Sequence, residues 1–215
     1  QLRATSPTAV VGPRAHDPLA MLDCYPFPRH VGSQHAGSPF GVDIATLLEA
    51  LRSELPGATI EYAAGCDVDG TDTSEFAAAQ EIVRRADVCV VALGDRAGLF
   101  GRGTSGEGCD AGDLRLPGVQ EEFLEALIET GTPVVLVMVA GRPYPLGKFA
   151  DRLGAVVQSF FPGEEAGSAL SGVLAGRVNP SGRLPVSIPR TPDGQPATYL
   201  TPALGLRSDV SNIDP

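Results

Sequence analysis

The sequence predicts an α/β fold: a mostly parallel sheet sandwiched between helices, with a late antiparallel edge strand. Short apolar runs alternate with amphipathic stretches, as in folds whose parallel strands are joined by helices. The run 134–139 is apolar at every position, as a central strand must be when helices cover both faces. The segment 182–189 alternates in polarity and contains prolines, which sheets admit mainly at their edges.

Individual elements follow from spacing and from the residues at their ends. In the first helical stretch four leucines, from Leu47 to Leu55, repeat at the three-to-four residue interval of a buried stripe. Ser74 is predicted as an N-cap and Gly131 as a C-cap. Strands are expected at 8–12, 59–63, 88–93, 133–140 and 155–160. Helices are expected at 44–55, 74–86, 119–130 and 164–175.

The composition is that of an ordinary globular protein. Of 215 residues, 43% are hydrophobic and 20% are charged, which is enough for a core of normal size. We expect one domain over 1–189 and an extended tail, rich in Pro, Thr and Gly, over 190–215. The chain begins without Met and stops with no closing element, so we expect it to be a piece of a longer protein.

Charge and cysteine usage exclude several classes of protein. A net charge of −10 argues against a nucleic-acid partner, and no apolar run approaches the length of a membrane span. The four cysteines show no close pairing and no disulfide framework, which favours a reducing compartment such as the cytoplasm. Cys89, in an apolar run, is expected to be a buried reduced thiol.

No metal or cofactor is predicted. The histidines His16, His30 and His35 fall in one loop, but their spacing fits no recognised ligand set, and solvated loop histidines are expected. The sequence Gly101-x-Gly103-x-x-Gly106 spells a dinucleotide pattern, yet no helix follows it directly. The carboxylate of Glu107 would also repel a phosphate, so nucleotide binding is rejected.

Two connections are too long for simple turns. One runs from Gly12 to about Asp43 and the other from Gly94 to about Gly118, whereas strand-to-helix loops usually have about two to six residues. Both leave the carboxyl end of a strand, where open α/β sheets place their sites. If the first and third strands are adjacent, both connections flank the same crevice.

The second connection presents one carboxylate among glycines. Six glycines lie within fifteen residues, and Gly106 and Gly108 bracket Glu107, so the carboxylate can stand at a tip. Taken alone, a Glu of this kind is more often a solvated loop charge than a catalytic group.

A family resemblance changes this interpretation. The string Ser-Gly-Glu-Gly-Cys-Asp at 105–110, followed by Leu-Arg-Leu-Pro-Gly-Val-Gln at 114–120, resembles a pattern of family 3 glycoside hydrolases. That pattern is Ser-Gly-Glu-Gly-Tyr-Asp-Arg, then Leu-x-Leu-Pro-x-x-Gln. Four further segments match the family in order, at 9–13, 65–66, 161–165 and 179–185.

The resemblance implies the second, α/β-sandwich domain of a retaining, exo-acting β-glycosidase, either a β-xylosidase or a β-glucosidase. In that family the nucleophile is an aspartate on a preceding (β/α)8 barrel, and a Glu of the second domain is the general acid/base. Glu107 matches this position. The implied partners are the barrel of the same protein and a β-linked oligosaccharide or glycoside. The 215 residues alone are then expected to hydrolyse nothing.

Candidate substrate-binding residues are Arg102, Asp110 and Tyr25. Asp110 also fits a bracing role as a hydrogen-bond acceptor within the loop. Tyr25, together with Phe27 and Phe40, forms either a wall for a sugar ring or an anchor of the first connection on the barrel. The sequence does not decide between these alternatives.

Three positions depart from the family pattern. Cys109 replaces a common Tyr, Ala111 a usual Arg, and Asp23 a frequent Gly, which leaves the sugar contacts of the loop open. The alternative function is a non-catalytic carbohydrate-binding or interdomain module. A barrel with an aspartate nucleophile upstream would decide for the enzyme.

Overall fold

The computed structural model describes residues 1–32, 35, 37 and 39–193, so the predicted tail beyond Asp193 lies outside the described residues. The strands are β1 (Thr8–Val11), β2 (Ile60–Ala63), β3 (Val88–Gly94), β4 (Val134–Val139) and β5 (Ala155–Gln158). The α-helices are α1 (Phe27–Gly32), α2 (Leu47–Glu54), α3 (Phe76–Arg84), α4 (Gln120–Ile128) and α5 (Ala166–Ala175). Short 3-10 turns lie at η1 (Pro18–Met21) and η2 (Ala150–Arg152).

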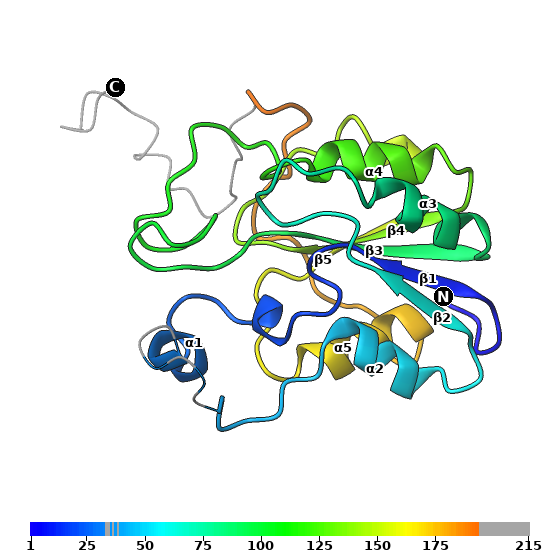
Figure 1. Cartoon of the computed structure of the whole chain (residues 1–215), viewed down its shortest axis with the longest axis horizontal. Helices are drawn as coiled ribbons and strands as arrows, with labels where there is room; N and C mark the ends of the chain where they lie inside the picture. The colour runs from blue at the N-terminus through cyan, green and yellow to red at the C-terminus, as the bar shows by residue number, and fades with distance from the viewer. Residues whose placement is uncertain (33–34, 36, 38, 194–215) are drawn as a thin grey trace.

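The five strands form one parallel sheet in the order β2-β1-β3-β4-β5. Helices α3 and α4 pack on each other over one face, and α2 and α5 pack on each other over the opposite face (Figure 1). This three-layer arrangement confirms the predicted α/β class. It also confirms that β1 and β3, the strands preceding the two long connections, are neighbours.

The core lies in two layers because successive strand residues point to opposite faces. On one side Val91, Leu93 and Met138 pack with Phe123 of α4. On the other side the alternating residues of β3 and β4 pack with the leucine stripe of α2, including Leu47. Strand β4 is buried along almost its whole length, as expected of its apolar sequence.

Helix ends differ from the sequence predictions by a few residues. Helix α2 begins at Leu47 because Thr46 caps it, accepting from the Glu49 amide at 3.2 Å while Glu49 accepts from the Thr46 amide at 2.9 Å. Ser74 is not an N-cap: α3 begins after Glu75, without a side-chain cap. Gly131 lies beyond the end of α4, at φ +81°, the left-handed conformation expected of a glycine at a helix C-terminus.

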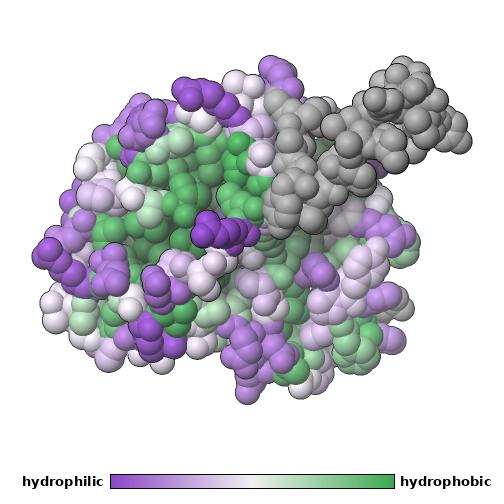
Figure 2. All heavy atoms as spheres, turned by 180° about the vertical axis from the view of Figure 1, so that it is seen from behind, coloured by the Kyte–Doolittle hydropathy of each residue, from purple (hydrophilic) through white to green (hydrophobic). Residues whose placement is uncertain are grey.

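The predicted antiparallel edge strand is wrong. Residues 182–189 form neither strand nor helix, and β5 itself is an edge strand of the described sheet, as is β2 at the other side. Pro185 and Pro189 lack the amide hydrogen that a ladder requires. The segment instead runs beside β5, where Ile188 packs against the core. It helps to line a groove of about 800 Å³, and Figure 2 shows apolar surface gathered on this back face of the molecule.

Within the described residues, none of the helices is both long enough and apolar enough to cross a membrane.

Candidate functional site

Both long connections leave the carboxyl edge of the sheet from adjacent strands. The first joins β1 to α2 and contains η1 and α1, while the second joins β3 to α4 and carries the glycine-rich sequence. Figure 1 shows the two connections projecting from the same end of the sheet. This is the edge at which open parallel sheets place ligands.

The second connection is closed at its base by a buried amide. The Gln120 side chain accepts from the Gly94 amide at 2.8 Å and donates to the Gly94 carbonyl at 2.8 Å. It also donates to the Val68 carbonyl, in the segment after β2, at 2.6 Å. Gln120 is fully buried, so these bonds satisfy a polar group that would otherwise be costly. The last residue of β3 and the first residue of α4 are therefore held together.

Within the connection, two arms lie side by side. Ala97 and Ser105 form a β-bridge, the Gly98 amide donates to the Ser105 carbonyl at 2.9 Å, and the Phe100 amide donates to the Glu107 carbonyl at 2.8 Å. These bonds define the backbone on both sides of the tip. Phe100 is itself at φ +56°, a conformation that costs energy for a bulky residue and that is concentrated at functional loops.

Gly106 can only be glycine in this backbone. Its φ is +124°, and a Cβ atom placed there would lie 2.1 Å from the Gly98 carbonyl oxygen and 3.1 Å from Sγ of Cys24. The two arms can therefore approach this closely only with hydrogen at position 106. Glu107 follows directly and is carried outward at the tip.

The carboxylate of Glu107 is exposed and meets a residue of the other connection. The hydroxyl of Tyr25 donates to Oε2 of Glu107 at 2.7 Å. This hydrogen bond is the main cause that raises the pKa of Tyr25 to about 12, with smaller contributions from desolvation and from the charge of Glu107. Tyr25 thus remains a hydrogen-bond donor throughout the neutral pH range. The residue as a whole is 59% exposed.

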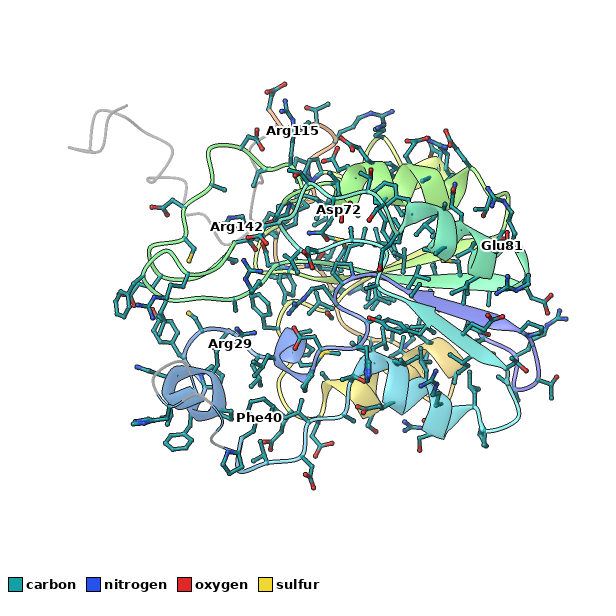
Figure 3. The ribbon with its side chains drawn as sticks, in the orientation of Figure 1. Arg29, Phe40, Asp72, Glu81, Arg115 and Arg142 are labelled. Atoms are coloured by element: carbon teal, nitrogen blue, oxygen red, sulfur yellow. The ribbon has the colours of Figure 1, made fainter. Side chains whose placement is uncertain are left out.

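Further hydrogen bonds hold Tyr25 in its own connection and join that connection to the glycine-rich loop. The Tyr25 amide donates to Oδ1 of Asp23 at 2.9 Å, which accounts structurally for the Asp at this position. Arg29 of α1 donates to the Ala97 carbonyl at 2.9 Å and to the Leu19 carbonyl at 2.6 Å, and so joins the first connection to the second. Figure 3 shows Arg29 in the space between α1 and the glycine-rich loop.

A buried carboxylate underlies the loop. Asp95 is 0% exposed and accepts from the Tyr144 hydroxyl at 2.5 Å, the Thr104 hydroxyl at 2.8 Å and the Gly141 amide at 2.9 Å. The Arg142 guanidinium lies 3.8 Å from the same carboxylate. Burial, followed by the neighbouring charge of Asp95, raises the pKa of Tyr144 above its usual range. The polar cluster joins the carboxyl ends of β3 and β4.

The other predicted site residues are spread around the tip. Arg102 and Asp110 are both exposed. Asp110 lines a shallow hollow of about 400 Å³ that also contains Arg142 and Tyr144. Phe27 is 71% exposed, whereas Phe40 is half-buried and packs against the core cluster on the face covered by α2 and α5 (Figure 3). Phe100, which the sequence did not single out, is 75% exposed.

Histidine and cysteine show little sign of metal or thiol chemistry. No group of three His, Cys, Asp or Glu side chains suited to a metal ion occurs in the described parts of the chain. His16 shares a 3.1 Å hydrogen bond with the Thr46 hydroxyl. All four cysteines are buried free thiols. Burial raises the pKa of Cys66 and of Cys89 to about 12, which keeps both thiols protonated and unreactive near neutral pH.

Sequence reasoning missed the residues that support the loop from below, namely Asp95, Arg142 and Tyr144. Asp95 follows a strand and precedes a glycine-rich run, so it looks like a solvated loop residue. One signal was available: Arg142 and Tyr144 come directly after β4, the neighbour of β3, at the same edge of the sheet.

Comparison with known sequences gives a consistent result. The sequence profile described as the glycosyl hydrolase family 3 C-terminal domain matches residues 2–212. A β-xylosidase of Formosa agariphila is 34% identical over 193 residues, covering 89% of this chain and 25% of the relative. A β-glucosidase of Rhizobium radiobacter is 41% identical over 115 residues, covering 54% of this chain and 13% of the relative. The chain thus spans about a quarter or less of these relatives.

Solved structures of β-glucosidases superpose on this chain. A β-glucosidase from Listeria innocua, in complex with isofagomine, superposes with a TM-score of 0.71 at 27% identity, over 88% of this chain and 24% of that chain. A β-glucosidase from Erythrobacter marinus superposes with a TM-score of 0.70 at 30% identity, over 95% of this chain and 29% of that chain.

Proposed function

Because the chain belongs to the glycosyl hydrolase family 3 C-terminal domain family, we propose that it is the second domain of a retaining, exo-acting β-glycosidase. In this proposal Glu107 is the general acid/base of an active site shared with a (β/α)8 barrel of the same protein. The substrate is a β-linked oligosaccharide or glycoside. The relatives named β-xylosidase and β-glucosidase support this class of substrate, and both sugars remain candidates.

One observation carries the proposal: an exposed carboxylate is held at a loop tip by a hydrogen-bond donor from a second loop. Glu107 is open to a reacting partner on its outer side, while the 2.7 Å bond from Tyr25 fixes one of its oxygens. A general acid must present one oxygen to the departing group in a defined direction. The arrangement of Tyr25 and Glu107 meets this requirement, and the other carboxylate oxygen is available for the proton.

The mechanism follows from the chemistry of two carboxylates. In a retaining enzyme they lie about 5–5.5 Å apart, and one attacks the sugar while the other protonates the departing oxygen. Glu107 first donates its proton to the aglycone. As a carboxylate it then removes a proton from the water that hydrolyses the covalent intermediate. The attacking aspartate is assigned to the barrel.

Around this centre we assign sugar contacts to Arg102, Asp110 and Tyr25. The exposed position of Arg102 and Asp110 on the loop that carries Glu107 supports hydrogen bonding to hydroxyl groups. Asp110 equally suits the bracing role, because it shares its hollow with Arg142 and Tyr144. Tyr25 serves mainly to orient Glu107, and its exposed ring provides an apolar surface for a pyranose.

A second candidate function is a non-catalytic carbohydrate-binding or interdomain module. Three exposed aromatic side chains at the same edge, Tyr25, Phe27 and Phe100, support it, since such rings stack on sugars and anchor interfaces. It predicts binding or docking that does not depend on the charge of Glu107.

The two functions are separated by Glu107→Gln in the full-length protein, assayed with aryl β-glycosides of poor and of activated leaving groups. A general acid predicts a loss of about 10²–10⁴-fold in kcat/KM for the poor leaving groups and little loss for the activated ones. The matched control is Glu129→Gln, an exposed glutamate at the far end of α4, which should leave all substrates unaffected. Equal rates in Glu107→Gln and wild type would leave only the non-catalytic module.

A further inference from the structure

Arg142 bonds to the glycine-rich loop on both sides of Glu107. It stands three residues after β4, in a different connection from the loop. Its Nη1 donates to the Thr104 carbonyl and its Nη2 donates to the Cys109 carbonyl. Glu107 lies between these two acceptors in the sequence. The side chain of Arg142 is only 19% exposed, so both bonds are partly shielded from water.

Asp95 fixes the direction of this guanidinium. The carboxylate lies 3.8 Å from Nη1 of Arg142 and is fully buried. It also accepts hydrogen bonds from the Thr104 hydroxyl and from the amide of Gly141, which is the residue before Arg142. The charge of Arg142 is thereby balanced under the loop, where an unpaired cation would be costly. The carboxylate and the guanidinium hold Thr104 through its side chain and its carbonyl respectively.

Only arginine supplies this pair of bonds. Its planar guanidinium has several donors in a rigid fork, which can reach two carbonyls at once, whereas a lysine ammonium is a single point charge. The restraint matters because the glycines on both sides of Glu107 give the tip more conformational freedom than other residues would. Within the loop, backbone bonds run from Gly98 to Ser105 and from Phe100 to Glu107, and Arg142 adds a restraint from a different connection.

We propose that Arg142 is a positioning residue for Glu107: by bonding the carbonyls of Thr104 and Cys109 it holds the tip where the carboxyl can reach the departing oxygen. This inference rests on the proposed function of Glu107. Arg142 itself exchanges no proton with the substrate in this scheme. A misplacement of about 1 Å can cost on the order of 10²-fold in rate, which sets the size of the expected effect.

The test uses the full-length enzyme with Arg142→Ala, Arg142→Lys, Glu107→Gln and the control Arg115→Ala. Arg115 is an exposed arginine of the same connection, with a 3.7 Å contact to Asp113. Arg142→Ala should lower kcat/KM by about 10²-fold for poor leaving groups and by far less for activated phenols, which need little protonation. Arg142→Lys should fall between Arg142→Ala and wild type, and Arg115→Ala should match wild type.

A merely structural role gives a different pattern, because losing active enzyme lowers kcat/KM by the same factor for every substrate. If Arg142→Ala does not fold, as judged by thermal melting, Arg142→Lys carries the same comparison. Equal losses across leaving groups, or no loss, in a variant of Arg142 would overturn the positioning role, provided that Glu107→Gln shows the selective loss. If Glu107→Gln itself shows no selectivity, the proposed function fails instead.

Discussion

The hydroxyl of Tyr25 and the carboxylate of Glu107 are joined by a 2.7 Å hydrogen bond across 82 positions of sequence. They meet because β1 and β3 are adjacent, so the connections that follow these strands leave the sheet side by side. Neither residue is buried, yet each is held by its own loop: Tyr25 by Asp23, and Glu107 by the bond from Phe100.

The titration of Tyr25 should report the contact directly. The pKa of Tyr25 is raised to about 12, chiefly by the hydrogen bond to Glu107. In Glu107→Gln the charge that strengthens this hydrogen bond is gone, so the pKa of Tyr25 should fall towards its ordinary value of about 10. The stabilisation is present below about pH 10 and is lost as the pH rises towards 12. The pKa of Tyr25 is measured by following the ultraviolet absorbance of tyrosinate against pH in the 215-residue chain.

The control for this titration is Tyr25→Phe, which should remove one transition from the absorbance curve. In the Tyr25→Phe background, adding Glu107→Gln should change nothing further. A shift that persisted in that background would mean that another tyrosine senses Glu107.

Much of the fold could be predicted because it depends on local pattern. All five strands overlap their predicted ranges, and the central strands β3 and β4 do so because buried parallel strands read as continuous apolar runs. The strand predicted at 182–189 was wrong because alternating polarity also occurs where a chain runs along an apolar edge of the sheet without pairing to it. Ser74 misled because a capping residue is preferred at a helix start but not required there, and α3 starts without a cap.

The candidate site was predictable only in part. Glu107 was assigned through the resemblance to family 3 and Tyr25 through its place in the first long connection, but their contact depends on strand order. The cluster of Asp95, Arg142 and Tyr144 depends on three-dimensional packing between two connections, which leaves no periodic signal. A buried aspartate in a glycine-rich run looks, in sequence, like any solvated loop acid.

Substitution of Gly106 by Ala should destabilise the loop. The backbone at φ +124° is unfavourable for a residue with Cβ, and that atom would lie 2.1 Å from the Gly98 carbonyl oxygen. We expect a loss of about 1–3 kcal/mol in the free energy of unfolding, measured by urea denaturation. Gly112→Ala is the matched control, because nothing lies within 4 Å of its Cβ position. Equal stability of the two variants would contradict the observed backbone.

Substitution of Asp95 by Asn should be costly. The change leaves the Arg142 guanidinium without its buried counter-charge. It also replaces one accepting oxygen of Asp95 by an NH2 group, which then faces a hydrogen-bond donor. Removing one partner of a buried pair typically costs about 3–5 kcal/mol, and we expect a loss near the lower end because Arg142 is 19% exposed. The comparison is Asp113→Asn, whose exposed contact with Arg115 at 3.7 Å should contribute about 0–1 kcal/mol. Thermal or urea unfolding distinguishes them.

The 215-residue chain by itself should hydrolyse no glycoside, because the nucleophile is assigned to the barrel. The measurement is incubation with aryl β-glucoside and aryl β-xyloside. Turnover above buffer that survived repurification would show that this domain contains a complete active site.

The second half of the reaction gives the sharpest test of Glu107. In Glu107→Ala of the full-length enzyme, activated aryl glycosides should still form the covalent intermediate, because their phenols leave without a proton. Hydrolysis of the intermediate should then limit turnover, since the base that activates water is missing. Azide needs no base, so it should accelerate turnover and yield a β-glycosyl azide, while the wild-type enzyme should gain nothing from it. A loop residue without catalytic function predicts equal losses for all leaving groups, a lower melting temperature and no azide product. Because azide attacks the covalent intermediate in place of water and needs no base, a glycosyl azide formed by the variant cannot arise from repaired folding.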